Sequence, residues 1–181
     1  MSKSTTNRRI LVPLASLVAA TAIVVGSGAT FTSRTENPGN SVVSGTLTQT
    51  NSRADQAIFD LGNVKPGDTV IGKVTITNSG SLPAAMTLSE VSASNGFVDQ
   101  ANLTMTLTDV TDAANKVQRW SGTFATLGTV SLGTWAAGEK HDYELAVTLK
   151  ETAGNNEQGK SATATYQWDG VQTAGATTTQ P

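Results

Sequence analysis

The sequence predicts an all-β protein: an antiparallel, jelly-roll-like β-sandwich of roughly eight to ten short strands. The first observation is alternation, because apolar and polar side chains exchange at every second residue in several segments, as half-buried strands require. The second is composition, since β-branched and hydroxyl side chains are frequent and charged residues make up only 14% of the chain. The third is the turn sequences that separate these segments. Downstream of residue 32, no segment has the pattern of a long amphipathic helix.

The clearest strand follows a tight turn in the N-terminal half. The turn reads Lys65-Pro66-Gly67-Asp68, in which proline fixes the second position and glycine supplies the positive φ of a type II turn at the third. Val74 and Ile76 then face one side of the strand, while lysine and threonine side chains face the other. A loop that contains Asn78 and Gly80 ends the strand. These turn residues are therefore expected to have structural roles.

The other strands are expected at similar spacing. Residues 116–120 and 122–127 are expected to form a hairpin, and residues 95–102 could hold one turn of helix. Leu145 and Val147 are expected in the core, on a strand that faces or adjoins the one carrying Val74. The remaining expected strands are residues 42–48, 58–61, 70–77, 85–91, 103–108, 130–135, 142–149 and 162–168.

The chain divides into four parts. Residues 1–32 begin with cationic side chains, continue with an apolar run and end with small residues, which is the order of a secretory signal peptide. Cleavage is expected between Ala29 and Ser33, and an uncleaved membrane anchor is the competing interpretation. Residues 33–43 are an N-terminal donor or linker segment, and residues 44–171 are the sandwich. Residues 172–181 lack an apolar pattern and are expected to be a disordered tail.

Charge and cysteine usage exclude several kinds of partner. The formal net charge is −2, and loss of the leader would leave nine basic side chains against 14 acidic ones. An acidic chain without a basic run is not expected to bind nucleic acid, or an anionic membrane surface after cleavage. The chain has no cysteine, so it has neither disulfides nor thiolate ligands.

No recognisable catalytic or metal-binding pattern occurs. The only histidine is His141, and we interpret it as a strand-end residue on a solvated rim, because zinc hydrolases generally need three protein ligands. Asp109 and Asp112 could share a calcium ion at a loop end, but a solvated turn is the preferred interpretation. We therefore expect no catalytic residue, no metal and no cofactor.

Two further features have alternative interpretations. Trp120, Trp135 and Trp168 could form a platform for sugar stacking, although such residues more often anchor a core. Core burial is the preferred interpretation for Trp168, and Trp135 is left open. The residues Asn102-Leu103-Thr104 match a glycosylation sequon, which is a weak signal by itself.

Four segments carry a resemblance to a known family. They are the apolar leader that ends Gly26-Ser27-Gly28-Ala29-Thr30-Phe31, the segment Ser44-Gly45-Thr46-Leu47, the pair Leu61-Gly62-Asn63-Val64-Lys65-Pro66-Gly67-Asp68 and Asn78-Ser79-Gly80-Ser81-Leu82, and the close Gln167-Trp168-Asp169-Gly170. In these segments the chain resembles the TasA/camelysin family of secreted bacterial matrix proteins. The resemblance implies a jelly-roll sandwich, a leader removed by a SipW-type signal peptidase, and a secreted protein in the extracellular matrix or on the cell surface.

The resemblance also implies a function. It points to a subunit that polymerises with itself, head to tail, into fibres of a biofilm matrix in which other matrix proteins could take part. The alternatives are a cell-surface metalloendopeptidase, which the camelysin label implies, and a monomeric adhesin or sugar-binding module, for which an exposed Trp135 would be the indicator. A freed N-terminus can add to a sheet edge of the next subunit as an extra strand. The residues expected at this contact are Arg34, Thr35, Glu36, Asn37, Asn40, Ser41, Val42 and Val43.

Overall fold

The computed structural model describes residues 42–59 and 64–179. The expected signal peptide, the donor residues before Val42, residues 60 and 61 of one expected strand, and the last two residues of the tail lie outside these ranges. The described residues from Val43 onward form one compact unit.

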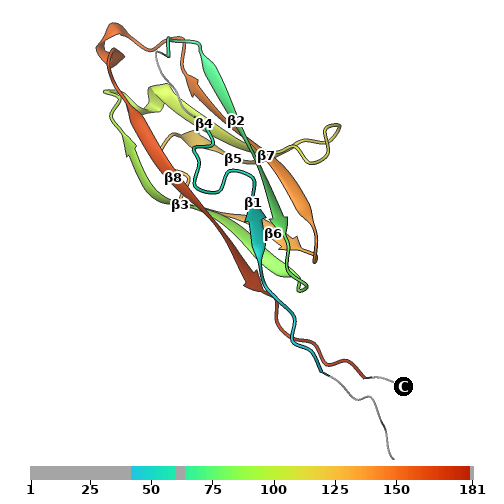
Figure 1. Cartoon of the computed structure of the whole chain (residues 1–181). Coiled ribbons are helices and arrows are strands. Elements are labelled where there is room, and N and C mark those ends of the chain that lie inside the picture. The colour runs from blue at the N-terminus through green and yellow to red at the C-terminus, as the bar shows by residue number, and fades with distance from the viewer. Residues whose placement is uncertain (1–41, 60–63, 180–181) are drawn as a thin grey trace, which may run out of the picture. The chain divides into compact units, whose positions relative to one another are not determined.

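Eight strands form two antiparallel sheets in the part of the chain that the structure describes (Figure 1). The five-stranded sheet has the order β1-β2-β7-β4-β5, and the three-stranded sheet has the order β6-β3-β8. Most successive strands belong to different sheets, so the chain crosses repeatedly from one layer to the other. The bounds are β1 Gln49–Asn51, β2 Thr69–Asn78, β3 Ala84–Asn95, β4 Leu103–Asp109, β5 Val117–Thr123, β6 Thr129–Trp135, β7 Lys140–Leu149 and β8 Ala162–Gln172. The predicted all-β sandwich is confirmed.

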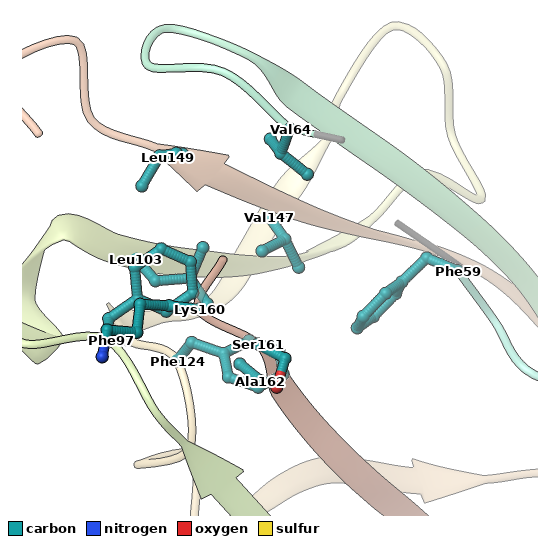
Figure 2. A pocket seen from close by; sticks show the side chains of 10 residues that line it. All are labelled: Phe59, Val64, Phe97, Leu103, Phe124, Val147, Leu149, Lys160, Ser161 and Ala162. Carbon is teal, nitrogen blue, oxygen red and sulfur yellow. The ribbon is translucent and has the colours of Figure 1, made fainter. Parts of the chain in front are cut away.

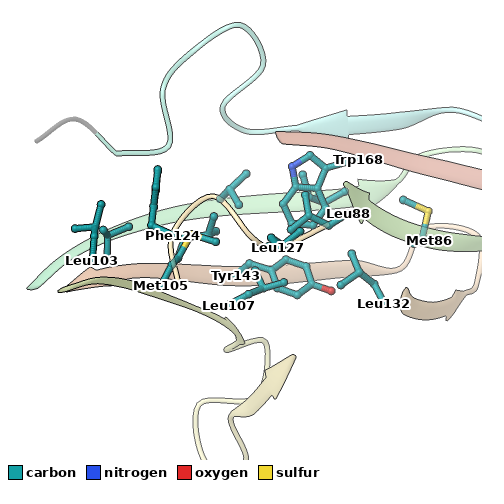
Figure 3. Close-up of a cluster of buried hydrophobic side chains, with 14 of the residues drawn as sticks. Met86, Leu88, Leu103, Met105, Leu107, Phe124, Leu127, Leu132, Tyr143 and Trp168 are labelled. Atoms are coloured by element: carbon teal, nitrogen blue, oxygen red, sulfur yellow. The ribbon is translucent and has the colours of Figure 1, made fainter. Parts of the chain in front are cut away.

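The core lies between the two sheets, as the alternation predicts. Val74 and Ile76 on β2 are buried, and so are Leu145 and Val147 on the adjacent strand β7. Side chains from the three-stranded sheet pack against them, including Met86, Leu88 and Trp168 (Figure 3). The parity read from the sequence is therefore correct for the central strands.

Replacing Val74 with alanine is expected to lower the free energy of unfolding by about 2–4 kcal/mol, because the side chain is buried and the site would keep a cavity. Thr75→Ala is the matched control, since Thr75 lies on the opposite face and is only half-buried. Its cost should be that of the hydrogen bond to Asp142, about 1 kcal/mol. Urea unfolding measures both values, and equal losses would mean that the register is wrong.

The turn before β2 has the predicted geometry. The amide of Asp68 donates to the carbonyl oxygen of Lys65 at 3.0 Å, and Gly67 has a φ of +90°. The carboxylate of Asp68 also accepts the amide of Lys65 at 3.1 Å and lies against its ammonium group. These hydrogen bonds hold the pKa of Asp68 below its usual value.

Three expected elements differ from the structure. Residues 42–48 form no strand, because Thr46 and Thr48 exchange isolated hydrogen bonds with the loop that follows β2, and pairing begins only at Gln49. Ile58 lies in a coil that crosses β2, where its carbonyl oxygen would be 2.4 Å from a Cβ at Gly72. The expected hairpin of residues 116–127 is wrong, since β5 runs without a turn to Thr123 and pairs with β4 throughout.

The short 3-10 elements agree with the expected turns. A helical turn expected within residues 95–102 is present as Gln100–Asn102, and a second 3-10 turn spans Asn155–Glu157 between β7 and β8. The last strand is longer than expected, because Gln172, assigned to the tail, pairs with Ala84.

Candidate functional site

Asn78, the last residue of β2, is a buried polar residue that forms hydrogen bonds through both its side chain and its backbone. Its side chain is almost wholly buried, with 1% of the residue exposed. The amide nitrogen Nδ2 donates to the carbonyl oxygens of Leu82 and Ala136, each at 2.9 Å. Its backbone amide donates to the carbonyl oxygen of Glu139, and its backbone carbonyl accepts the amide of Gly138. Asn78 thus joins the loop after β2 to the corner between β6 and β7.

The loop after β2 also holds the segment that precedes β1. The amide of Gly80 donates to the carbonyl oxygen of Thr48 at 3.0 Å, and the amide of Ser81 donates to that of Thr46 at 2.9 Å. A Cβ at Gly80 would lie 2.4 Å from the carbonyl oxygen of Thr46, and one at Gly45 would lie 2.4 Å from Leu82. The backbone contact at Gly80 requires glycine, whereas a Cβ at Gly45 would require the side chain of Leu82 to shift. Two parts of the sequence resemblance are therefore in direct contact.

A second polar cluster lies at the β6–β7 corner and combines residues from four elements. Asp109 ends β4 with a side chain only 7% exposed, and its Oδ2 atom accepts one hydrogen bond from Arg119 of β5 at 2.9 Å. The same oxygen lies 3.0 Å from Nδ1 of His141 on β7, whose Nε2 lies 2.9 Å from Oε1 of Glu139. The ring of His141 stacks on Trp135 with a centroid distance of 4.4 Å. The interpretation of His141 as a solvated-rim residue is wrong, since its side chain is only 16% exposed.

The environment of Asp109 favours its ionised form. Burial by itself would raise the pKa of Asp109, but hydrogen bonds from Thr111, Arg119 and His141 outweigh it and lower the pKa to about 2. Thr111 donates from Oγ1 to Oδ1 at 2.6 Å, and its amide donates to the same atom at 3.1 Å. Asp109 is therefore a fixed negative charge at neutral pH.

The cluster does not have the geometry of a nucleophilic triad. The hydroxyl of Thr111 directs its hydrogen to Asp109 and accepts the amide of Asp142, although it lies 3.3 Å from Nδ1 of His141. A nucleophile needs its proton directed at the base, and here it points to a carboxylate that is already ionised.

The cluster also does not fit a metal ion. The two ring nitrogens of His141 face different carboxylates on opposite sides of the ring, and the carboxylate of Asp109 is occupied by a guanidinium group. Donor atoms must converge on one point to hold zinc. Among residues 42–59 and 64–179, no group of three His, Asp or Glu side chains could hold a metal ion. The predicted lack of enzyme activity stays a prediction.

The calcium site considered for Asp109 and Asp112 is not formed by their side chains. The carboxylate of Asp112 accepts the amide of Ala114 and the side chain of Asn115, which closes its own turn. Asp109 binds other partners, as described above. Asn102 of the glycosylation sequon donates to the buried carboxylate of Glu157 at 3.0 Å, so its nitrogen has a structural role.

The tryptophans belong to the core. Trp135 is 1% exposed and Trp168 is 6% exposed. Trp120 packs partly buried against the same cluster. The open question about Trp135 is settled in favour of the core, which removes the indicator for a sugar-stacking surface.

Two hollows lie along β8, the strand at one edge of the three-stranded sheet. The first, about 260 Å³, is bordered by Leu47, Gln49 and Trp168, and the second, about 410 Å³, by Arg53, Ile58 and Thr165 among others. Among the described strands β8 pairs only with β3. Across the gap, the side chain of Gln49 donates to the carbonyl oxygen of Trp168 at 2.6 Å. The two hollows together, called the β8 groove below, follow a free sheet edge.

The third cavity is apolar, with a volume of about 110 Å³ (Figure 2). Leucine and valine side chains of β4 and β7, phenylalanine side chains of the adjoining loops and Ala162 of β8 form most of its wall, and Lys160 and Ser161 provide its polar groups. Binding sites for small molecules usually combine apolar walls with several convergent polar groups. This cavity does not have them.

Of the predicted donor residues, the structure describes two. Val42 is fully exposed and Val43 is 88% exposed, and neither belongs to a strand. The turn residues Lys65 to Asp68, Asn78 and Gly80 lie where the sequence placed them, at the two ends of β2. Sequence reasoning missed Arg119 and Glu139. Asp109 carried a signal, since it continues the inward parity of Leu103, Met105 and Leu107.

The fold and these contacts define a small antiparallel β-sandwich in which polar clusters connect two loops and the edge strand β8 borders an open groove. Comparison with known families gives a more specific identity. A family model described as camelysin metallo-endopeptidase matches residues 5–102, more than half of the chain, so the chain belongs to this family. The match includes Asn78 and its loop but ends before Asp109 and His141. No curated protein sequence matches the chain. In the described residues, no helix is long and apolar enough to cross a membrane.

Proposed function

We propose that the chain is a secreted structural subunit that assembles with copies of itself into extracellular or cell-surface fibres of a bacterial biofilm matrix. Family membership supports a protein of this extracellular type. The observation that carries the proposal is the β8 groove, because an unpaired edge strand beside an open groove is a place where an extended peptide can add to a sheet.

The added strand in this proposal is the N-terminal segment of the next subunit, residues 33–43. A SipW-type signal peptidase would free this segment by removing the leader. One copy then gives a segment and accepts another at a different surface, so the contact is head-to-tail and extends into a filament when the rotation does not close. Pro38 cannot donate to a strand ladder, so pairing involves the residues around it.

Disulfide trapping tests this arrangement, because the chain has no cysteine of its own. Val43→Cys places a thiol on the donor, and Thr165→Cys places one on an exposed residue of the groove. Under oxidation, the double variant should give a ladder of reducible oligomers. The ladder should appear in the samples in which electron microscopy shows fibres. The matched control combines Val43→Cys with Ser121→Cys, which is exposed on β5 at the distant edge of the other sheet, and should give no ladder.

Deletion of residues 33–41 tests the donor separately. The shortened protein should keep its strand content by circular dichroism and stay monomeric. Fibres from this variant that equal those of the full mature chain would disprove the donor mechanism, as would equal ladders from both cysteine pairs.

The competing function is a metallo-endopeptidase, which the description of the family model favours. It predicts chelator-sensitive cleavage of a protein substrate by the purified chain, with loss of activity in His141→Ala. The structural proposal predicts that any such cleavage is unchanged by this substitution.

A further inference from the structure

His141 lies between two carboxylates, and each of them can accept a hydrogen bond from the ring. A neutral ring has only one N–H group to donate. Its Nδ1 atom is 3.0 Å from Asp109, and its Nε2 atom is 2.9 Å from Glu139. A neutral imidazole has one N–H group and one lone pair, whereas the imidazolium cation has two N–H groups. Only the cation can donate to both carboxylates.

We propose that His141 is a protonation-dependent latch of the β6–β7 corner, closed when the ring is an imidazolium and opened when it loses its proton. The inference does not depend on fibre assembly. It concerns residues 136–141 and their contacts with Asn78, which have no assigned role in the proposed fibre assembly.

The surrounding charges balance only when the ring is charged. Asp109 and Glu139 contribute two negative charges, and Arg119, bound to Asp109, contributes one positive charge. Tyr143 is the other titratable group beside the ring, and burial raises its pKa well above the usual value, so it stays neutral. Trp135 stacks on the ring and favours a cation there. A neutral His141 would leave one uncompensated negative charge in this half-buried site.

Loss of the proton should release Glu139 rather than Asp109. The side chain of Glu139 is 39% exposed and can turn to water, whereas that of Asp109 is 7% exposed and is also bound by Arg119 and Thr111. A neutral ring therefore keeps its N–H group on Asp109 and presents a lone pair to Glu139.

The carboxylate of Glu139 holds the corner closed. Its Oε2 atom accepts the amide of Ala136 at 2.6 Å. The backbone of the same turn exchanges two hydrogen bonds with Asn78, in which Gly138 donates to Asn78 at 2.8 Å and Asn78 donates to Glu139 at 2.9 Å. When Glu139 turns away, the turn is no longer fixed by its carboxylate, and the two backbone hydrogen bonds to Asn78 open more often. The latch is therefore connected to the same residue that holds the loop after β2.

The sign of the pH dependence follows from the proton count. The closed corner binds one proton more than the open corner, so closure is favoured at acidic pH and weakens as the pH rises. Exchange protection of the Gly138 and Asn78 amides, corrected for the intrinsic rate, should fall by about tenfold between pH 6 and pH 9, the loss expected for one hydrogen bond to a charged group.

Nuclear magnetic resonance of the full chain measures both sides of the proposal. At pH 6, both ring nitrogens of His141 should show the shifts of protonated nitrogens. Glu139→Gln should remove the pH dependence of exchange, because an amide can pair with a neutral ring. Glu151→Gln, at an exposed carboxylate outside the cluster, should keep it.

Two results would overturn the latch. One is a neutral-tautomer pattern of ring nitrogens at pH 6, and the other is a pH dependence in Glu139→Gln equal to that of the parent chain.

Discussion

Replacement of Asn78 with leucine should lower the free energy of unfolding by about 3–5 kcal/mol. Leucine has a similar volume but cannot donate, so the carbonyl oxygens of Leu82 and Ala136 would lose their partner in a buried site. The amide of Gly80 would lose the oxygen that it faces at 3.3 Å. Chemical unfolding should detect the change, and the thermal midpoint should fall by roughly 10 °C or more.

Asn155→Leu is the matched control, because Asn155 is exposed in a loop and its cost should stay within about 0.5 kcal/mol. A double-mutant cycle with Glu139→Gln adds a second test. The two substitutions affect the same corner, so their effects should not be additive. Additive effects would mean that Asn78 and the corner are independent.

Asp109→Asn should cost about 3–5 kcal/mol at neutral pH, because the substitution leaves the guanidinium of Arg119 without its counter-charge and takes a charged acceptor away from the ring of His141. The cost should depend on acidity. The pKa of Asp109 is about 2 in the folded protein, against 3.8 for an aspartate without these contacts. The ionised side chain therefore stabilises the folded state by about 2 kcal/mol above pH 4. This contribution is lost as the pH falls from about 4 to about 2. Over that interval, the difference in thermal stability between the parent chain and the variant should become smaller.

Asp112→Asn serves as the control for Asp109. Its side chain is exposed and bonds only within its own turn, so its substitution should have a small effect. A gap between the parent chain and Asp109→Asn that stays constant from pH 7 to pH 2 would show that Asp109 is not stabilised as an anion.

The alternation of side chains was sufficient to predict the sheets, because burial of one face imposes a period of two on every central strand. Val74, Ile76, Leu145 and Val147 all lie on the predicted face. The edges were predicted less well. The expected strand at residues 42–48 has β-branched residues and alternation. Its hydrogen-bonding partner is the loop after β2 and not a strand. No local feature of the sequence indicates this partner.

The polar cluster could be predicted only in part. Asp109 and His141 share the inward parity of their strands, but the sequence analysis interpreted them as a solvated turn and a solvated rim residue. The partner Arg119 could not be found in this way, because a β-bulge shifts the pairing of β5 with β4 next to it and changes which side chains face inward. Glu139 comes from the loop after β6, where no periodicity applies. Asn78 was recognised as a turn residue, but its burial depends on the β6–β7 corner, which is 58 positions further along the chain at Ala136.

The close contact of residues 45–48 with the loop after β2 has a mechanical consequence. A pull on the chain at Val43 would not unravel the domain one residue at a time, because the hydrogen bonds of Thr46 and Thr48 to Ser81 and Gly80, and those of β1 to β2, lie side by side along the direction of the chain. Bonds arranged in this way carry a tensile load together, in shear. The load is transferred to β2, the strand that is also bonded to β7 in the interior of the five-stranded sheet. A load applied at Val43 along β1 would thus reach the interior of the five-stranded sheet.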